Sequence, residues 1–387
     1  MSAAAVETGW ALPRLLTGIR SDRALTLAEH TATFGPLVRR RDLIETVARA
    51  GLHGRGGAAF PTARKLSAVV EQRGEPVVVV NAAEGEPASS KDRALIRLTP
   101  HLVLDGAALV ADAIGAKHVV VVIAENARPE HHALAQALRE RRGAFEIATV
   151  PAGFVSGEET ALIQAIEGRP AKPTLKPPYP FERGYLVQNA ETLAHVALIG
   201  RHGAQWFRSA GTHEAPGTAL ISLSGAVAQP GVHEIELGAT LADVVASLGG
   251  TNEPVSAFLV AGFFGRWVTA RDAASLELTA STLGAGVIVA HPARACPIAE
   301  TARIARYLAG ESAGQCGPCV YGLDAIVGAL ESLARRDSDA PLAVSRLERW
   351  TAQVRGRGAC RHPDGAARLV ASALDAFPAE IARLARR

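Results

Sequence analysis

The chain has 387 residues, of which 48% are hydrophobic and 20% charged, and its net charge is +3 at pH 7. A chain of this size and apolar content is expected to fold into two or three domains with cores of their own, and its small, dispersed charge without a basic aromatic stripe argues against nucleic-acid binding. No apolar run reaches the length of a membrane span, and residues 1–18 lack the charged start and apolar core of a signal peptide. We therefore expect a cytoplasmic protein with no direct membrane span.

The first half of the chain alternates between helical and strand patterns. Residues 1–38 have weak periodicity and predict a variable N-terminal arm, whereas residues 39–210 predict an α/β domain. The four consecutive valines at 77–80 are typical of a buried parallel strand. Alternation of strands with helices predicts a parallel, doubly wound, Rossmann-like sheet. The expected helices cover 42–49, 95–114 and 129–142, and the expected strands cover 77–80, 119–123 and 145–150.

A glycine-rich loop, residues 51–57, precedes the valine strand, and two glutamates, Glu84 and Glu86, follow it. Glycines allow a ligand to lie directly on the backbone, and polar residues at the carboxyl end of a parallel strand are where open α/β sheets bind ligands. The loop lies before the strand and has Ala59 where a third glycine would stand, so it does not match the dinucleotide fingerprint. Together these residues predict a pocket for a planar cofactor that carries a phosphate.

Two further strings follow the third strand. Gly157 precedes Glu158 and Glu159, which open a helix, where acidic side chains interact favourably with the helix dipole. The proline-rich loop 175–180 is suited to hold the ring of Tyr179 rigidly. Either string alone is compatible with an ordinary helix start or turn. Their order along the chain, together with the glycine loop, predicts that they belong to one ligand site.

The second half of the chain predicts two smaller domains. A composition change near 211–217 marks a linker, and the short strands and single helix within 214–292 predict a β-grasp-like domain. Residues 296–387 contain four helical stretches and predict a helical bundle. The expected strands here cover 219–225, 232–236 and 257–264, and the expected helices cover 241–248, 298–308, 321–335, 343–354 and 365–377.

All four cysteines lie in the last quarter of the chain. Cys316 and Cys319 form a Cys-x-x-Cys pair at a loop that opens a helix, and Cys360 follows in a later loop. In a cytosolic chain such clustering favours a metal or redox site over disulfides, and thiolate sets of this kind hold iron–sulfur clusters. A zinc ion bound by these cysteines and His362 is a less favoured alternative, and Cys296 is expected to be a buried, small apolar residue.

The strings at 54–65, 81–87, 157–162, 175–192 and 311–319 resemble the NADH-binding flavoprotein subunit of respiratory complex I, the F-type subunit. The same module occurs in NAD-linked hydrogenases and formate dehydrogenases. The resemblance extends from about residue 40 to the end of the chain. The domains it implies are an FMN- and NADH-binding α/β domain at 39–210, a soluble-ligand-binding, β-grasp-like domain at 214–292 and a helical iron–sulfur domain at 296–387.

The resemblance implies an NADH-oxidising electron-input subunit, an oxidoreductase of the NADH dehydrogenase type. It would pass hydride from NADH to FMN, and then single electrons through an iron–sulfur cluster to a redox partner protein, which would be an iron–sulfur subunit or a ferredoxin. The chain would then be part of a larger complex, cytoplasmic or held at the inner face of the membrane through its partner. Two alternatives stay open: a stand-alone FMN diaphorase or ferredoxin-linked reductase, and a non-catalytic scaffold subunit with a degenerate site.

The resemblance also assigns roles to particular residues. The glycine loop and a lysine would hold the FMN phosphate, aromatic rings would stack on adenine or nicotinamide, and polar side chains would bind the ribityl chain and flavin ring. Two glutamates would bind ribose or carboxamide groups at the catalytic centre. The cofactor-binding residues it implies are Gly54, Arg55, Gly56, Gly57, Phe60, Lys65, Asn81, Glu84, Phe154, Gly157, Glu158, Tyr179 and Asn189. The catalytic residues it implies are Glu86 and Glu159, and the cluster ligands are Cys316, Cys319 and Cys360.

The cysteine string departs from the family pattern at one position. Ala313 stands where the pattern has its first cysteine, and an alanine cannot bind iron. Iron–sulfur clusters normally use four cysteines. Three outcomes are compatible with the remaining thiolates: a [4Fe–4S] cluster with a non-cysteine fourth ligand, a [3Fe–4S] cluster, or loss of the cluster. The candidates for a fourth ligand are Ser312, His362 and Cys296.

Overall fold

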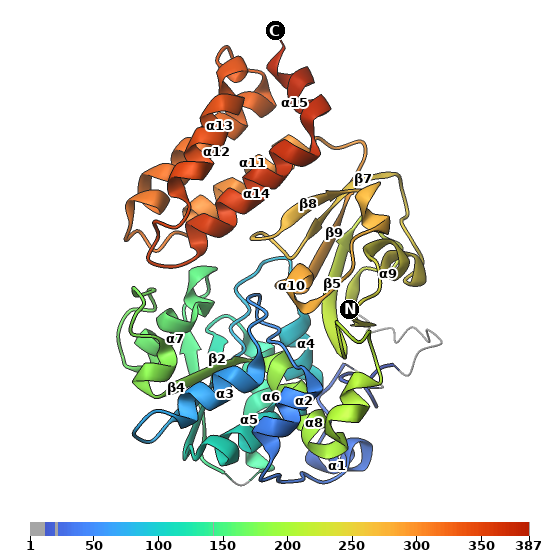
Figure 1. Cartoon of the computed structure of the whole chain (residues 1–387), viewed down its shortest axis with the longest axis vertical. Helices are drawn as coiled ribbons and strands as arrows, with labels where there is room; N and C mark the ends of the chain where they lie inside the picture. The colour runs from blue at the N-terminus through green and yellow to red at the C-terminus, as the bar shows by residue number, and fades with distance from the viewer. Residues whose placement is uncertain (1–11, 20–21, 142, 387) are drawn as a thin grey trace.

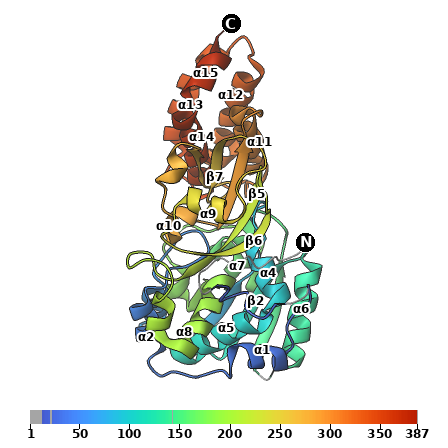
Figure 2. The same ribbon diagram turned by 90° about the vertical axis from the view of Figure 1, so that its right-hand side faces the viewer.

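The computed structural model describes residues 12–19, 22–141 and 143–386. The chain is elongated, with an α/β domain at one end, a small sheet in the middle and a helical bundle at the other end (Figure 1, Figure 2). The predicted fold class is thereby confirmed. Of the predicted N-terminal arm, residues 1–11 and 20–21 lie outside the described residues, and helix α1 (Leu27–Phe34) lies within them.

The α/β domain is built on a parallel sheet of four strands in the order β3-β2-β1-β4. The first three strands were predicted, whereas β4 was not. Strand β4 pairs with β1 so that Asn189 lies opposite Asn81, and the carboxyl ends of these two strands therefore meet at one edge of the sheet. The strands are β1 (Val77–Asn81), β2 (His118–Ala124), β3 (Phe145–Val150) and β4 (Tyr185–Asn189).

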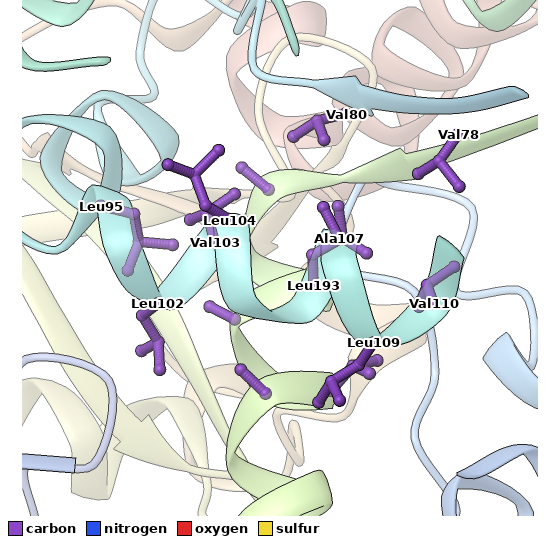
Figure 3. Close-up of a cluster of buried hydrophobic side chains, with 14 of the residues drawn as sticks. Val78, Val80, Leu95, Leu102, Val103, Leu104, Ala107, Leu109, Val110 and Leu193 are labelled. Atoms are coloured by element: carbon purple, nitrogen blue, oxygen red, sulfur yellow. The ribbon is translucent and has the colours of Figure 1, made fainter. Parts of the chain in front are cut away.

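Side chains alternate between the two faces of this sheet, because successive residues of a strand point to opposite sides. Val78 and Val80 belong to the larger core of the domain. There they lie near the buried side chains of helix α5 (Pro100–Ile114) (Figure 3). Val79 faces a smaller core that includes Leu162 of α7. This domain also contains the helices α2 (Leu43–Ala50), α3 (Thr62–Val70), α6 (Arg128–Arg139) and α7 (Glu159–Ile166).

The prediction of one helix over 95–114 is wrong. The structure has two helices, α4 (Lys91–Leu98) and α5 (Pro100–Ile114), bent by 95° relative to each other. Pro100 has no amide hydrogen, so it begins a helix well but cannot continue one. Apolar residues recur on both sides of the break, which made the segment resemble one helix. Within the described ranges no single helix is long and apolar enough to cross a membrane, and α4 and α5 reach that length only when counted together.

Helices α5 and α8 (Ala190–Arg208) cross at close range. A Cβ atom on Gly106 would lie 1.8 Å from the carbonyl oxygen of Leu193 in α8. Figure 3 shows Leu193 beside the middle of α5. The absence of a side chain at Gly106 therefore allows the two backbones to touch, which brings the start of α8 against the sheet.

The middle of the chain forms a mixed sheet of five strands in the order β6-β5-β9-β7-β8. Helix α9 (Leu241–Ser247) and the short α10 (Ala280–Leu283) accompany it. One face of the sheet packs with α9, and the other, through Leu259 and Trp267, packs on the helical bundle. The predicted strand over 257–264 is too long, because a turn begins at residue 261. The strands are β5 (Thr218–Gly225), β6 (Gly231–Glu236), β7 (Val255–Val260), β8 (Arg266–Thr269) and β9 (Val287–Pro292).

The C-terminal part is helical, as predicted. The predicted helix over 321–335 begins later than expected, because Pro318–Leu323 forms a wide π-type turn. Turns of this kind often occur at functional sites, and this one contains Cys319. The helices are α11 (Pro297–Gly310), α12 (Asp324–Arg335), α13 (Ala340–Val354), α14 (His362–Ala376) and α15 (Pro378–Ala385).

Glu86 joins the loop after β1 to the turn between β7 and β8. Its carboxylate accepts hydrogen bonds from the amide of Phe263 at 2.8 Å and from the amide of Ala88 at 3.2 Å. Burial raises the pKa of Glu86 from 4.5 to about 7. Two domains of the chain are therefore connected through a carboxyl group that titrates near neutral pH.

Replacing Gly106 with alanine should destabilise the α/β domain. Alanine favours a helix over glycine by ~1 kcal/mol, but the new methyl group would force the α5 and α8 backbones apart at a cost of ~1–3 kcal/mol or more. We expect a lower urea midpoint, measured by circular dichroism. The control is Gly328→Ala, at an exposed position of α12 with open space around it, which should raise stability slightly. An unchanged midpoint for Gly106→Ala would contradict the close approach of the two helices.

The Glu86 contact should make stability depend on pH. The folded chain holds the Glu86 proton more tightly than the unfolded chain, so stability should fall as the pH rises from 4.5 through about 7. The difference between the folded and unfolded pKa values of Glu86 corresponds to a loss of ~3 kcal/mol in the free energy of unfolding. The partial exposure of the side chain makes the actual loss smaller. Glu86→Gln keeps the hydrogen-bond acceptor and should abolish this part of the slope between pH 5 and pH 8 in urea denaturation. Exposed Glu71→Gln is the control, and equal slopes for all three proteins would refute the assignment.

Candidate functional site

The glycine loop presents free backbone amides at the carboxyl edge of the parallel sheet. The amides of Gly54 and Arg55 are used inside the protein, the latter donating to Thr192 Oγ1 at 2.9 Å. Those of Gly56 and Gly57 are exposed and have no hydrogen-bond partner among the residues that the structure describes. Gly57 has a φ of +107° with open space where a side chain would begin. Consecutive free amides in such a turn fit an anion such as a phosphate group.

A cluster of buried charges lies beneath this loop. Lys91 Nζ lies 2.8 Å from Glu191 Oε2 and 2.9 Å from Asp92 Oδ1, and Arg55 Nε lies 3.7 Å from Glu191 Oε1. Burial by itself would raise the pKa of Glu191, but the charge of Lys91 and its other cationic neighbours hold it at about 2. The Arg55 guanidinium points into the protein and donates to the carbonyl oxygen of Thr218 at 2.9 Å. Arg55 therefore holds the glycine loop in place and does not offer its guanidinium to the exposed surface.

Three of the predicted polar residues meet at the ends of β1 and β4. Asn81 Nδ2 donates to the carbonyl oxygen of Gly157 at 2.9 Å, and Asn189 Nδ2 donates to Asp92 Oδ2 at 2.6 Å. Glu84 is buried and accepts from amides in the first turn of α4, that of Asp92 at 3.1 Å. These contacts bring the predicted residues to one edge of the sheet and show that several of their polar atoms fix the surrounding loops.

Two lysines from different segments meet a pair of glutamates at the start of α7. Lys65 Nζ lies 3.1 Å from Glu159 Oε2, while Lys176 Nζ lies 2.9 Å from Glu158 Oε1 and 2.7 Å from Glu159 Oε1. Burial opposes the charged form of Glu159, but Lys65 and Lys176 outweigh it and lower its pKa. The four side chains are 21–29% exposed, so a ligand can reach them. We call this group the lysine–glutamate cluster.

Lys176 is the member of this cluster that the sequence reasoning missed. It lies in the proline-rich loop 175–180, in which the sequence reasoning assigned a role only to Tyr179. The two prolines after Lys176 hold the loop in shape, and a basic residue between a leucine and two prolines was the available signal.

The predicted aromatic residues fall into two groups. Phe60 and Tyr179 are 48% and 46% exposed, and their open faces are suited to stack on a flat ring. Phe154 is more buried, and its ring centroid lies 4.5 Å from that of Phe264 in the small domain. Glu86 lies in the same contact region, where backbone amides occupy its oxygens. Direct contact of Phe154 and Glu86 with NADH stays a prediction.

Cys316, Cys319 and Cys360, the three cysteines that match the family pattern, lie near one another in space. The amide of Cys319 donates to the carbonyl oxygen of Cys316 at 3.1 Å. Burial raises the pKa of the Cys319 thiol to about 12, and the nearby thiols of Cys316 and Cys360 contribute to this rise. The structure places no three His, Cys, Asp or Glu side chains, within its described ranges, around the position of a single metal ion. The cysteines of an iron–sulfur cluster bind different iron atoms, so neighbouring thiols that do not surround one point are compatible with a cluster.

Cys296 lies apart from these three thiols. Its Sγ atom is 3.4 Å from Glu380 Oε1 at the far end of the bundle, and the residue is partly exposed. The expectation that Cys296 is a buried apolar residue is therefore wrong, because α15 covers it only partly and supplies a polar neighbour.

The segment 311–319, which contains Cys316 and Cys319 and which we call the cysteine loop, contacts the α/β domain directly. Glu311 Oε2 accepts a hydrogen bond from the amide of Phe154 at 2.6 Å. Burial raises the pKa of Cys360, while the charges of Glu158 and Lys176 are near enough to act on the same thiol in opposite directions. Gln315 Nε2 also donates to the carbonyl oxygen of Pro173 at 3.0 Å, so the cysteine loop packs on segments that adjoin the lysine–glutamate cluster.

Two family models match the chain over this region. The Nuo51 FMN-binding domain matches residues 47–198, and the NADH-ubiquinone oxidoreductase-F iron-sulfur binding region matches residues 299–384. The first match contains the glycine loop, the parallel sheet and the lysine–glutamate cluster. The second match contains Cys316, Cys319 and Cys360.

Individual proteins match over most of the chain. An F-type subunit of NADH-quinone oxidoreductase in Rhizobium meliloti (strain 1021) is 33% identical, over 88% of this chain and 87% of the relative. The corresponding F-type subunit in Streptomyces coelicolor is 32% identical, over 88% of this chain and 82% of the relative. A chain of an NAD+-reducing [NiFe]-hydrogenase in the H2-reduced state matches with a TM-score of 0.84 and 32% identity, over 91% of this chain and 64% of that chain. The chain therefore belongs to the family of F-type subunits of NADH-quinone oxidoreductase.

Proposed function

We propose that this chain oxidises NADH with bound FMN and passes the electrons one at a time through an iron–sulfur cluster to a partner protein. The observation that carries the proposal is the contact between the cysteine loop and the segments beside the lysine–glutamate cluster, where Gln315 Nε2 donates to the carbonyl oxygen of Pro173 at 3.0 Å and Glu311 accepts from the amide of Phe154. An enzyme that receives two electrons as hydride and releases them singly needs its flavin site and its iron–sulfur site close together. In this chain the residues proposed for the two sites come from the α/β domain and from the helical bundle, which contact each other.

FMN, when bound, supplies the hydride acceptance and the one-electron release. The residues of the chain would position it. The free amides of Gly56 and Gly57 would bind its phosphate, and Lys65 would add a positive charge. Asn81 and Asn189 lie at the adjoining ends of β1 and β4, where they would orient the flavin ring.

The nicotinamide nucleotide would bind on the exposed side of the same region. Phe60 and Tyr179 would stack on its flat rings. Glu159 would accept hydrogen bonds from ribose hydroxyls or the carboxamide. Lys176 would keep that carboxylate ionised, because its positive charge lowers the pKa of Glu159.

The names of the relatives support a proposal for the partner and the location. The Rhizobium meliloti protein is a subunit of NADH-quinone oxidoreductase, and the Cupriavidus necator relative is the alpha subunit of the NAD-reducing hydrogenase HoxS, 36% identical over 55% of this chain. We propose that this chain likewise works in a larger complex, with an iron–sulfur subunit or a ferredoxin as its electron acceptor. We place it in the cytoplasm or, through that partner, at the inner face of the membrane.

A second candidate function is a stand-alone FMN diaphorase without a working cluster. The observation that favours it is Ala313, which removes one cysteine from the set that a cluster normally uses. The two functions differ in whether the purified chain contains iron and reduces a small ferredoxin.

The first test is the visible absorption spectrum and the iron content of anaerobically purified protein, before and after addition of NADH. The proposal predicts a flavin band and a broad cluster absorption that NADH bleaches. A flavin band that bleaches in an iron-free protein would support the diaphorase. A protein that stays colourless after addition of FMN would refute both and leave a scaffold.

Lys176→Ala should weaken NADH binding without removing FMN. Lys176 contacts both Glu158 and Glu159, so its loss should disorder the carboxylates and raise the KM for NADH by about 10-fold, which corresponds to ~1.4 kcal/mol. Steady-state kinetics with ferricyanide as acceptor measures this. Lys172→Ala, at an exposed position shortly before this loop, is the control and should leave the KM unchanged. Equal KM values for the two variants would refute the role of Lys176.

A further inference from the structure

A four-iron cluster in this chain would need a protein ligand in place of the missing cysteine. Three thiols, those of Cys316, Cys319 and Cys360, are near one another, and Ala313 has no donor atom. Of the other candidates, Cys296 is engaged with Glu380 at the other end of the bundle. Ser312 and His362 therefore remain.

His362 is buried with one ring nitrogen satisfied and the other free. The residue is 3% exposed, and its Nε2 lies 2.7 Å from the carbonyl oxygen of Leu308, so Nε2 carries the proton and donates it. Nδ1 is then an acceptor, and it has no hydrogen-bond partner in the described structure. Leaving a buried acceptor unpaired costs ~1–3 kcal/mol.

This arrangement is typical of a histidine that binds a metal. A ligating histidine usually donates its second ring nitrogen to a carbonyl or carboxylate, which fixes the tautomer and turns the free nitrogen toward the metal. Imidazole is a good ligand for iron, and histidines replace cysteines at some iron–sulfur centres. Ser312 lacks these properties: its Oγ carries its own proton, accepts from the amide of Gly314 at 3.1 Å and interacts with the Cys319 thiol as a hydrogen-bond partner.

The position of His362 supports the same assignment. It begins α14 two residues after Cys360. Leu308, which holds its Nε2, lies at the end of α11, directly before the segment that contains Ala313. His362 therefore follows one proposed cysteine ligand in the chain, and its side chain is hydrogen-bonded to the helix that leads to Ala313.

We propose that Nδ1 of His362 is the fourth protein ligand, so that the chain holds a [4Fe–4S] cluster with three cysteines and one histidine. This proposal rests on the cluster of the proposed function and goes beyond it by naming the ligand. A neutral imidazole replaces an anionic thiolate, so the cluster carries one negative charge less. It is therefore easier to reduce than it would be with four cysteines, as at other centres with histidine ligands.

The test is pulsed EPR of the dithionite-reduced, anaerobically reconstituted full chain, prepared with and without ¹⁵N-labelled histidine. We expect about four irons per chain and a strongly coupled nitrogen whose coupling changes with the label. His362→Cys should keep the four irons, lose the nitrogen coupling and lower the reduction potential. Ser312→Ala is the matched control and should retain the iron and the nitrogen coupling.

Several results would overturn the proposal. These are an intact four-iron cluster in the unaltered chain without a coupled histidine nitrogen, a three-iron cluster, or a coupling that survives in His362→Cys. The labelled spectrum of the unaltered chain decides the matter even where a variant fails to fold. An iron–sulfur cluster without a coupled histidine nitrogen overturns this proposal alone. A chain that takes up no iron, although NADH still reduces its FMN, overturns this proposal and the cluster part of the proposed function, and leaves the diaphorase.

Discussion

The buried ion pair between Lys91 and Glu191 is the contact on which the arrangement of the site depends. It joins the start of α4 to the start of α8, and Glu191 also accepts from the amide of Leu220 in β5 at 2.9 Å. Arg55 adds the glycine loop to the same cluster. One buried carboxylate therefore holds together the glycine loop, two helices and the small domain. Removing either partner would leave an unpaired buried charge, at a cost of ~3–5 kcal/mol.

A second connection joins all three parts of the chain around Phe154. Its amide is held by Glu311 of the cysteine loop, and its ring lies against Phe264 of the small domain and 5.7 Å from the ring of His362. Glu86 fixes the neighbouring turn. The loops that line the proposed flavin site thus depend on the bundle for their conformation, and the bundle depends on them to cover the histidine.

Much of the fold could be predicted because its signals are local. The valine runs at 77–80 and 119–123 indicated the central strands, and the spacing of apolar residues indicated the helices of the bundle. Strand β4 was missed because Tyr185–Asn189 is short and ends in polar residues. The bend at Pro100 was missed because the apolar pattern continues across it.

The candidate site was less predictable, because its contacts connect residues far apart in the chain. Glycine and cysteine strings marked the loops, but no local pattern shows that Lys176 meets Glu159 or that Glu86 meets Phe263. The same holds for the free nitrogen of His362, which follows from a carbonyl group in a different helix. Sequence located the segments, and only the packing of the domains showed which polar atoms are occupied and which are free.

The position of Lys176, which pairs with two carboxylates beside the cysteine loop, has an energetic consequence. Its charge acts both on Glu159, where a nucleotide is proposed to bind, and on a proposed ligand of the cluster. A nucleotide that moves Lys176 would therefore change the electron affinity of the cluster. Thermodynamic reciprocity then requires that the electron count of the cluster change the affinity for the nucleotide by the same factor. A single lysine would thus couple release of the oxidised nucleotide to departure of the electrons.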